Sequence, residues 1–298
     1  MPNHIEIISN KTDFFINDVN IHRYENVISY KYALCTPKLN LEINNDIKSE
    51  NTNYYFIFDC PGEDALGHWV YESFIFYSLY SEIKTHFKSS LQILSSNHKK
   101  YVKSLLRFFN LDTNIVYKID TNTKNVCYFP PIISMNDLKD VDIFKKYIHI
   151  YANSIKERLI IFPQSIDNLF LPRNKKDNYV INDRIIPFTE EICNNIIENG
   201  GTVLNTYELN NMNLQYNIIF NSDCIIMDYG SSFMFNCIFL ENKKIILLHN
   251  DNLNFYLSFY ANKIIFDYIK ERNTISFVDV TKPVSISSII SLDKINEN

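Results

Sequence analysis

The sequence has little glycine, no long hydrophobic run and no familiar cofactor motif. Only 5 of its 298 residues are glycine, and no GxGxxG, GxxxxGK[ST], GxSxG or HExxH pattern occurs. Dinucleotide oxidoreductases, P-loop proteins, esterases and zinc proteases are therefore not expected. The longest apolar-rich stretches, 54–58 and 74–80, are far shorter than the ~20 residues of a membrane span. The first residues also lack the pattern of a secretion signal, so we expect a cytoplasmic protein.

An excess of positive charge is lacking as well. With 29 basic and 34 acidic residues the net charge is −5, and no block of Lys or Arg interrupts the chain. Nucleic acid is therefore not an expected partner, because binding to a phosphate backbone depends on a basic surface. The 6 cysteines are scattered, with no CxxC pair and no histidine at metal-ligand spacing. This scatter predicts buried free thiols, with neither a disulfide framework nor a zinc site.

What the sequence does have is enough apolar residues for two cores. Hydrophobic residues make up 46% of the chain and aromatic residues 14%. A length of 298 residues exceeds the about 100–200 typical of one domain, which favours two. We place the break near Phe162-Pro163-Gln164, where Pro and polar residues interrupt the periodicity. The expected domains are 1–160 and 161–282, followed by a helix in 283–298 that packs back on the first domain.

Strand and helix patterns alternate through both halves, which predicts an α/β fold. In the first half we expect weak strands at 4–8 and 27–34, then strands at 54–60, 91–96, 114–119 and 126–129, and helices at 68–87, 98–109 and 140–159. In the second half we expect strands at 168–174, 202–207, 224–229, 244–250 and 274–280, and helices at 189–199, 211–220 and 231–240. Two such arrays predict two facing doubly wound domains with a cleft at the carboxyl ends of their strands.

The segment 224–248 is the most informative one for function. A buried strand ends in Asp228-Tyr229, turns at Gly230-Ser231-Ser232 and enters an apolar helix. Backbone amides and the positive end of the helix dipole would form a site for a phosphate or diphosphate. An ordinary helix start with a serine cap is the alternative.

Basic groups in the same half favour an anion site. Arg173 follows a predicted strand and Arg184 comes soon after it, and arginine suits bidentate contact with phosphate. Lys175 and Lys176 are better explained as solvated loop residues.

Acidic residues and a histidine gather where the first predicted buried strand leads into a helix. The segment contains Asp59, Glu63, Asp64, His68 and Glu72. His68 and Glu72 are four residues apart and so share one helix face. A neutral histidine can take a proton from a sugar hydroxyl, and a neighbouring carboxylate would orient the ring and stabilise its cation. The alternatives are that His68 caps the helix or packs against Trp69, and that Glu63 and Asp64 are turn residues.

Two further patterns carry less weight. Asp140-Val141-Asp142 matches the DxD signature of metal-dependent sugar transferases, but it opens an amphipathic helix, so we interpret these acids as first-turn residues. His249 lies at the end of a predicted strand and could line the cleft, although a structural role is at least equally supported.

The order of these motifs resembles glycosyltransferase family 61. The early match is the segment Gly67-His68-Trp69-Val70-Tyr71-Glu72. The later matches are Arg173 after a strand, Arg184 before an acidic helix start, a glycine-ended helix, Gln215 within a helix, and the turn Tyr229-Gly230-Ser231-Ser232-Phe233-Met234-Phe235-Asn236. In the family a histidine usually occupies the position of Tyr229.

The resemblance implies an inverting glycosyltransferase of GT-B architecture, with two facing Rossmann-like domains, no cofactor and no obligatory metal. The implied donor is a nucleotide sugar, with a UDP-sugar as first choice, and the acceptor is a glycan hydroxyl; a homodimer is left open. The donor-binding residues would be Arg173, Arg184, Tyr229, Gly230, Ser231, Ser232 and Asn236. The base would be His68, with Asp64 and Glu72 in reserve. The alternatives are a non-catalytic nucleotide- or carbohydrate-binding scaffold and a metal-dependent transferase that uses Asp140 and Asp142.

Overall fold

The computed structural model describes residues 11–16, 19–32, 39–60, 66–87, 90–96, 100–131, 141–172, 189–206, 209, 211–249, 257–258 and 260–280, and all that follows concerns these residues. The chain divides into two compact units, Met1–Tyr147 (unit 1) and Ile148–Asn298 (unit 2). The division falls inside helix α4 (Val141–Lys156), earlier than the break expected near residue 163. The strand expected at 4–8 and the helix expected in 283–298 lie outside the described residues.

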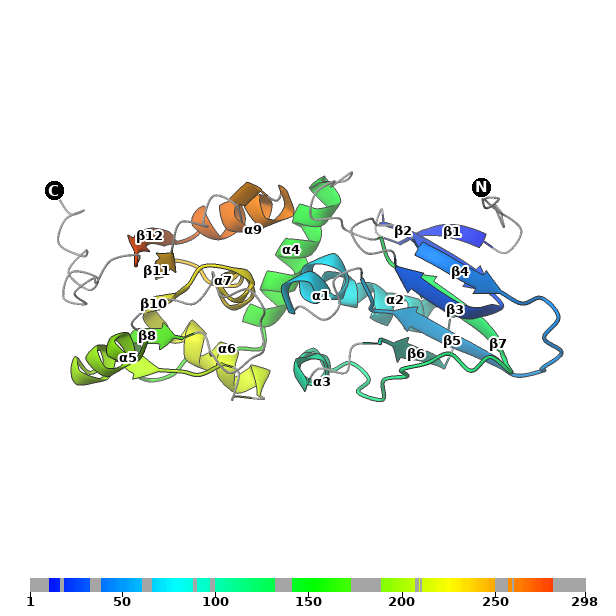
Figure 1. Ribbon diagram of the computed structural model, residues 1–298, viewed down its shortest axis with the longest axis horizontal. Helices are drawn as coiled ribbons and strands as arrows, with labels where there is room; N and C mark the ends of the chain where they lie inside the picture. Colours follow the sequence, from blue (N-terminus) through cyan, green and yellow to red (C-terminus); the bar gives the residue numbers. More distant parts are fainter. Residues whose placement is uncertain are drawn as a thin grey trace. The chain divides into compact units, whose positions relative to one another are not determined.

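Unit 1 contains a mixed five-stranded sheet in the order β1-β2-β7-β5-β6 (Figure 1). The strands are β1 (Lys11–Ile16), β2 (Val19–Glu25), β7 (Lys124–Phe129), β5 (Thr52–Ile57) and β6 (Leu91–Leu94). β7, β5 and β6 are parallel, as the alternation of strands and helices predicts. β2 pairs antiparallel with both β7 and β1, and β3 (Val27–Tyr32) with β4 (Leu39–Ile43) forms a separate hairpin.

The sheet of unit 1 is covered on both faces, which explains the apolar run in β5. Tyr55 and Ile57 belong to a core cluster that includes Val27 and Tyr32 of the hairpin. On the opposite face, the Phe56 ring lies 5.9 Å from the Tyr80 ring in α2 (Tyr77–Phe87). A strand buried on both faces has no polar face, and its sequence is therefore apolar at successive positions.

The long helix expected over 68–87 is divided into three pieces. These are α1 (Leu66–Glu72), a 3-10 turn η1 (Phe74–Phe76) and α2. Ser73 interrupts the α-helix with φ −137° and ψ −60°. The strand expected at 114–119 is reduced to a single bridge between Val116 and Leu94, and the preceding helix is α3 (Lys100–Phe108).

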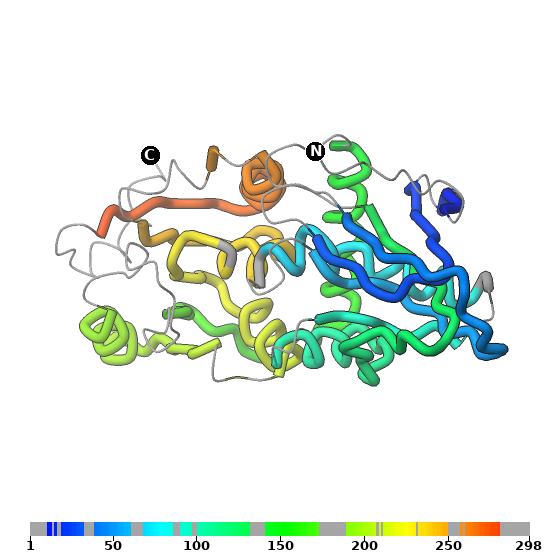
Figure 2. The backbone as a smooth tube through the Cα atoms, turned by 45° about the vertical axis from the view of Figure 1, so that its right-hand side comes forward, coloured from blue at the N-terminus to red at the C-terminus, as the bar shows by residue number. Residues whose placement is uncertain are grey.

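Unit 2 contains a five-stranded sheet in which every pair of neighbours is parallel, in the order β9-β8-β10-β11-β12. The strands are β8 (Ile166–Leu171), β9 (Thr202–Val203), β10 (Ser222–Asp228), β11 (Lys244–His249) and β12 (Thr274–Asp279). Numbered from β8, this is the order 2-1-3-4-5 of flavodoxin-like doubly wound sheets. The chain path from β8 (green) to β12 (red) can be followed in Figure 2.

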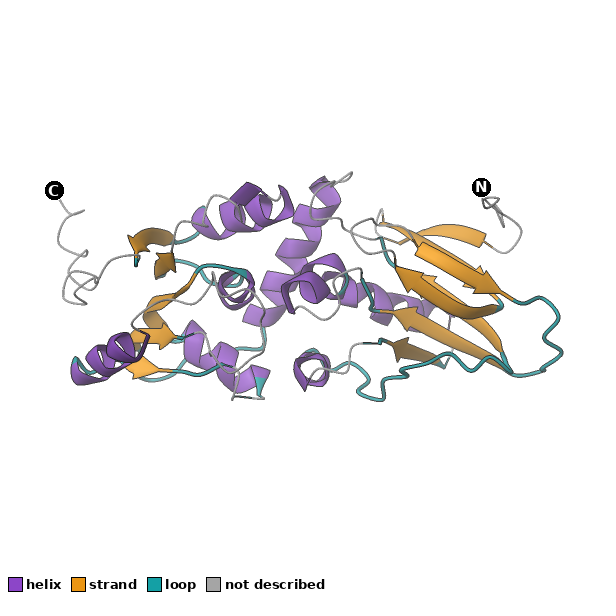
Figure 3. Ribbon diagram, in the orientation of Figure 1, coloured by secondary structure: helices purple, strands orange, loops and turns teal. Residues whose placement is uncertain are grey.

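Strand and helix alternate along unit 2 (Figure 3). The helices are α5 (Thr189–Glu198), α6 (Met212–Phe220), α7 (Ser231–Cys237) and α9 (Tyr260–Lys270). Ile192 and Ile196 of α5 pack in one cluster with Ile226 of β10, whereas Met227 contacts Cys237 of α7. Successive residues of β10 thus meet helices on opposite faces of the sheet.

The described residues therefore form an α/β fold, with one mixed and one parallel five-stranded sheet and the small antiparallel sheet of β3 and β4. The elements expected between residues 168 and 280 are all found, although β9 has only two residues. Helix α9 is an addition, since no element was expected between 250 and 274.

Candidate functional site

His68 and Glu72 form a hydrogen-bonded pair on α1. Their atoms Nδ1 and Oε1 lie 2.8 Å apart, one helical turn from each other. The histidine side chain is 46% exposed, whereas that of Glu72 is only 6% exposed. The pair shares one helix face, as the spacing predicts, and it combines a solvent-accessible imidazole with an enclosed carboxylate.

The neighbouring Trp69 fixes the orientation of α1. Its side chain is fully buried, and its ring stacks on Phe74 at 4.8 Å and lies 6.4 Å from Phe58 at the end of β5. Because Trp69 points into the core, the preceding residue His68 points away from it. A contact of His68 in the structure is the carboxylate of Glu72.

Asp59, two residues after β5, is enclosed in a polar cluster. It accepts hydrogen bonds from the Ser95 hydroxyl at 2.8 Å, from the Ser96 backbone nitrogen at 2.9 Å and from the Tyr30 hydroxyl at 2.5 Å. Burial raises the pKa of Asp59, and the hydrogen bonds only partly oppose that effect. Its oxygens connect β3, β5 and the end of β6, which is a structural role. Asp64 and Glu63 lie outside the described residues.

In unit 2, the turn expected to bind an anion is located between β10 and α7. Gly230 has φ 143° and ψ −162°, a backbone conformation that is essentially restricted to glycine. A Cβ placed on Gly230 would meet nothing within 4 Å, so backbone conformation and not crowding requires glycine here. The chain turns sharply at this point and begins α7 at Ser231.

The described side chains around this turn are more enclosed than an open anion site would be. Tyr229 is buried, and its ring lies 5.8 Å from Phe233 and 6.4 Å from Phe266 of α9. Burial also raises the pKa of Tyr229 well above its usual value. Asn236 is buried, and Ser232 is only partly exposed. Of the described side chains predicted to bind the donor, Ser232 is thus the most accessible.

The turn lies where the order in which the chain adds strands to the sheet reverses, between β8 and β10. From β8 the chain leads to β9 on one side, and β10 lies on the other. Leu171 at the end of β8 pairs with Met227, so β8 and β10 end side by side. In doubly wound sheets, ligands bind in the crevice outside the carboxyl ends of such strands. Arg173 follows β8 by two residues; it and Arg184 lie outside the described residues.

The other residues singled out from the sequence have plainer positions. Asp142 is exposed in the first turn of α4, as expected for a helix-start acid, and Asp140 lies outside the described residues. The ring of His249, at the end of β11, lies 5.9 Å from Phe277 of β12. Among the described residues, no group of three or more His, Cys, Asp or Glu could hold a metal ion.

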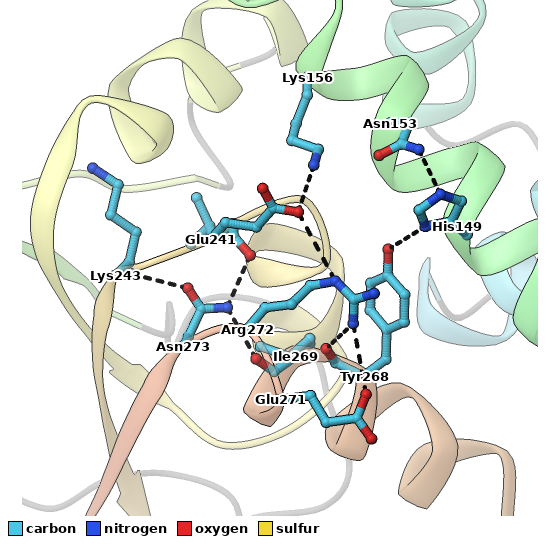
Figure 4. Close-up of polar contacts among 11 residues, drawn as sticks. His149, Asn153, Lys156, Glu241, Lys243, Tyr268, Ile269, Glu271, Arg272 and Asn273 are labelled. Carbon is cyan, nitrogen blue, oxygen red and sulfur yellow. Dashed lines mark hydrogen bonds and ion pairs between the residues drawn. The ribbon is translucent and has the colours of Figure 1, made fainter.

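Unit 2 also contains a polar network that the sequence analysis did not predict (Figure 4). His149 Nδ1 lies 3.3 Å from the hydroxyl of Tyr268, and the Arg272 guanidinium lies 3.7 Å above the Tyr268 ring. Lys156 and Arg272 both face Glu241, at 2.6 Å and 3.9 Å. These contacts join the second half of α4 to α9 and to the turn before β11. His149 and Tyr268 are 119 positions apart and Lys156 and Glu241 are 85 apart, so no local pattern indicates these contacts.

A second contact that the sequence did not predict joins α6 to α7. Gln215 Nε2 donates to Asn236 Oδ1 at 2.6 Å, and Asn236 Nδ2 donates to the Ser232 hydroxyl oxygen at 3.1 Å. The resemblance singled out Gln215 and Asn236 separately, 21 residues apart. The contact between them depends on how the two helices pack.

No helix within the described ranges combines the length and the apolar composition that a membrane span requires. Comparison of the sequence with models of known protein families and with curated proteins finds no match. The functional argument therefore depends on the residues themselves.

Proposed function

We propose that this chain is an inverting glycosyltransferase that moves a sugar from a nucleotide-sugar donor, a UDP-sugar by first choice, to a glycan hydroxyl. The observation that carries the proposal is the contact between His68 Nδ1 and Glu72 Oε1 at 2.8 Å. An accessible imidazole held by an enclosed carboxylate suits proton abstraction from a hydroxyl, since the carboxylate stabilises the imidazolium that forms.

With the Nδ1 hydrogen donated to Glu72, the lone pair of the neutral ring is on Nε2. The acceptor oxygen attacks the anomeric carbon of the donor sugar, and its proton passes to His68 Nε2. The bond between that carbon and the diphosphate oxygen breaks, and the nucleoside diphosphate leaves with the bonding electron pair. Attack opposite the leaving group inverts the anomeric centre.

The donor is assigned to unit 2, at the carboxyl ends of β8 and β10. Tyr229, Gly230, Ser231, Ser232 and Asn236 form or support the turn after β10, and Arg173 and Arg184 follow β8 in the sequence. We assign the two arginines to the leaving diphosphate, in place of a metal ion. A preorganised donor to a developing oxyanion contributes about 3–4 kcal/mol to transition-state stabilisation. With the base on unit 1 and the donor on unit 2, the proposed architecture is that of a GT-B enzyme.

Release of free nucleoside diphosphate tests this function. The full chain is incubated with UDP-, GDP-, CMP- and dTDP-linked sugars and a panel of glycan acceptors, and release is corrected for hydrolysis of the donor without acceptor. Acceptor-dependent release is expected with one donor class, and His68→Gln should abolish it. His149→Gln, a histidine of the network in Figure 4, is the matched control and should retain activity. Acceptor-dependent release that persists in His68→Gln would contradict the proposed base.

A second candidate function is a non-catalytic nucleotide- or carbohydrate-binding scaffold of the same fold. The observation that favours it is the enclosure of Tyr229 between Phe233 and Phe266, at the position where the resembled family usually has histidine. The same assay separates the two functions, because a scaffold would bind the nucleotide without acceptor-dependent release of nucleoside diphosphate.

A further inference from the structure

The contact between α6 and α7 has a defined hydrogen-bond direction. Gln215 and Asn236 are 2% and 1% exposed, and the relay runs from Gln215 Nε2 to Asn236 Oδ1 and from Asn236 Nδ2 to Ser232 Oγ. A primary amide has one oxygen that accepts and one nitrogen that donates. Because Gln215 occupies the oxygen of Asn236, the nitrogen of Asn236 is the atom that faces Ser232.

This direction determines what the Ser232 hydroxyl can do. Its oxygen accepts from Asn236, so the relay gives the hydroxyl hydrogen no acceptor. Ser232 is partly exposed and lies two residues after Gly230, at the carboxyl end of β10 beside β8. The hydrogen can therefore be donated to a ligand oxygen at this edge of the sheet.

A contact that served only to pack α6 against α7 would not need the hydrogen bonds of Gln215 and Asn236. The relay leaves Gln215 Oε1 buried with no hydrogen-bond partner, an unfavourable state for an acceptor. Two apolar side chains would fill the space between α6 and α7 without that cost. The retained polarity is explained if it serves the hydroxyl at the other end of the relay.

We infer that Gln215 and Asn236 are positioning residues, which orient the Ser232 hydroxyl so that it donates its hydrogen to a diphosphate oxygen of the bound nucleotide sugar. This inference rests on the proposed function and extends it. It changes the role of Asn236 from a ligand contact to a buried support, and it assigns a role to Gln215, which the sequence analysis did not place in the site.

Reversing the direction of the relay tests the inference. In Gln215→Glu, position 215 presents only acceptor oxygens when ionised, so Asn236 must turn Nδ2 toward it and Oδ1 toward Ser232. Asn236→Asp likewise presents an acceptor to Ser232. In both variants the Ser232 hydroxyl would donate its hydrogen to the oxygen of residue 236 and not to a ligand, although Ser232 itself is unchanged. Binding of UDP and of inorganic pyrophosphate is measured by calorimetry at about pH 8, where a buried carboxyl with a raised pKa is more fully ionised.

We expect Gln215→Glu, Asn236→Asp and Ser232→Ala each to weaken pyrophosphate and UDP binding by about tenfold, as for loss of one charge-assisted hydrogen bond. Ser232→Thr should retain the affinity. The double variant Gln215→Glu with Ser232→Ala should bind no more weakly than Ser232→Ala alone, because both changes remove the same hydrogen bond. Ser222→Ala is the matched control: it removes a buried serine bond to the Ile218 carbonyl in the same unit and should leave affinity unchanged.

The outcomes are distinguishable. If the wild type binds UDP and pyrophosphate and the relay variants bind equally well, the inference is wrong and the proposed function stands. Equal weakening in Ser222→Ala would show a general loss of stability, which also overturns the inference. If the wild type binds neither probe, both the inference and the proposed donor site fail. Should Asn236→Asp not fold, Gln215→Glu and the comparison of Ser232→Ala with Ser232→Thr decide the matter.

Discussion

His68 lies one helical turn before Glu72, and the carboxylate that faces its Nδ1 is the enclosed member of the pair. The enclosed group is held in a low-dielectric site, where it interacts more strongly with a positive charge than it would in water. A proton taken up by His68 would therefore be stabilised by Glu72, whereas the ring itself stays accessible to an acceptor.

Glu72→Gln should lower turnover at least ~tenfold, because general-base contributions are of this order or larger and a glutamine carries no charge to stabilise the imidazolium. The amide retains the size of the side chain, and the fold should persist. Turnover with the best donor and acceptor is compared with that of Glu50→Gln, which changes an exposed glutamate of unit 1 and should behave as wild type. Unchanged turnover in Glu72→Gln would show that His68 acts without this partner.

Arg173→Ala should keep the fold and lower turnover about a hundredfold or more, if its guanidinium stabilises the leaving diphosphate. Lys175→Ala is the control, since the sequence analysis explains Lys175 as a solvated loop residue. Both substitutions lie outside the described residues, so circular dichroism and thermal unfolding should accompany the kinetics. Near-normal turnover in Arg173→Ala would remove this residue from the mechanism.

The secondary structure of unit 2 could be predicted because its local signals agree. β10 and β11 are short apolar runs between polar turns. α5 begins at Thr189, has acids in its first turn and is followed by Gly200 at φ 79°. Helix α9 was missed although Ala261, Ile264, Ile265 and Ile269, all buried, have helical spacing. The apolar spacing of these residues is thus a local signal for this helix.

Unit 1 shows what local patterns leave undetermined. The segment 68–87 is apolar almost all round, so its periodicity carries no sign of the break at Ser73. The position of β2 beside β7 depends on pairing between residues about a hundred positions apart, such as His22 with Phe129. Chain direction in such a pairing is not encoded in either strand alone.

Local patterns likewise predict only part of the candidate site. The contact of His68 with Glu72 follows from a spacing of four on a helix, so the sequence predicts it. The enclosure of Tyr229 depends on Phe266 in α9, which is 37 residues away in the chain and belongs to the helix that was missed. The relay from Gln215 to Ser232 likewise depends on helix packing.

Gly230→Ala should destabilise the protein by about 1–3 kcal/mol, the usual cost of a strained backbone conformation. The space beside Gly230 is open, so the effect is conformational and not steric. Gly200→Ala is the matched control, because it too has a positive φ and open space but lies at the end of α5. Both variants should unfold more easily in denaturant, whereas only Gly230→Ala should also weaken UDP binding. If Gly230→Ala and Gly200→Ala had equal effects on UDP binding, the turn at Gly230 would not be part of the donor site.

Asp59→Asn should reveal a pH dependence of stability with an unusual sign. Burial raises the pKa of Asp59 above the ordinary value of an aspartate, so the unfolded chain loses this proton at lower pH than the folded chain does. Its contribution to stability is full below the unfolded pKa and is lost as pH rises through the folded pKa. Asparagine does not titrate. The free energy of unfolding of the wild type relative to Asp59→Asn should therefore decrease as pH rises from below the unfolded pKa through the raised folded pKa.

Asp13→Asn provides the opposite case for the same measurement. Partial burial raises the pKa of Asp13, but hydrogen bonds and charge interactions with His22 and Lys11 outweigh that effect and lower it overall. The stability contributed by Asp13 is present above the unfolded pKa and is lost as pH falls through the folded pKa. The difference between wild type and Asp13→Asn should thus increase with pH, by a small amount because the side chain is partly exposed. Parallel pH curves for the two variants would show that burial does not dominate at Asp59.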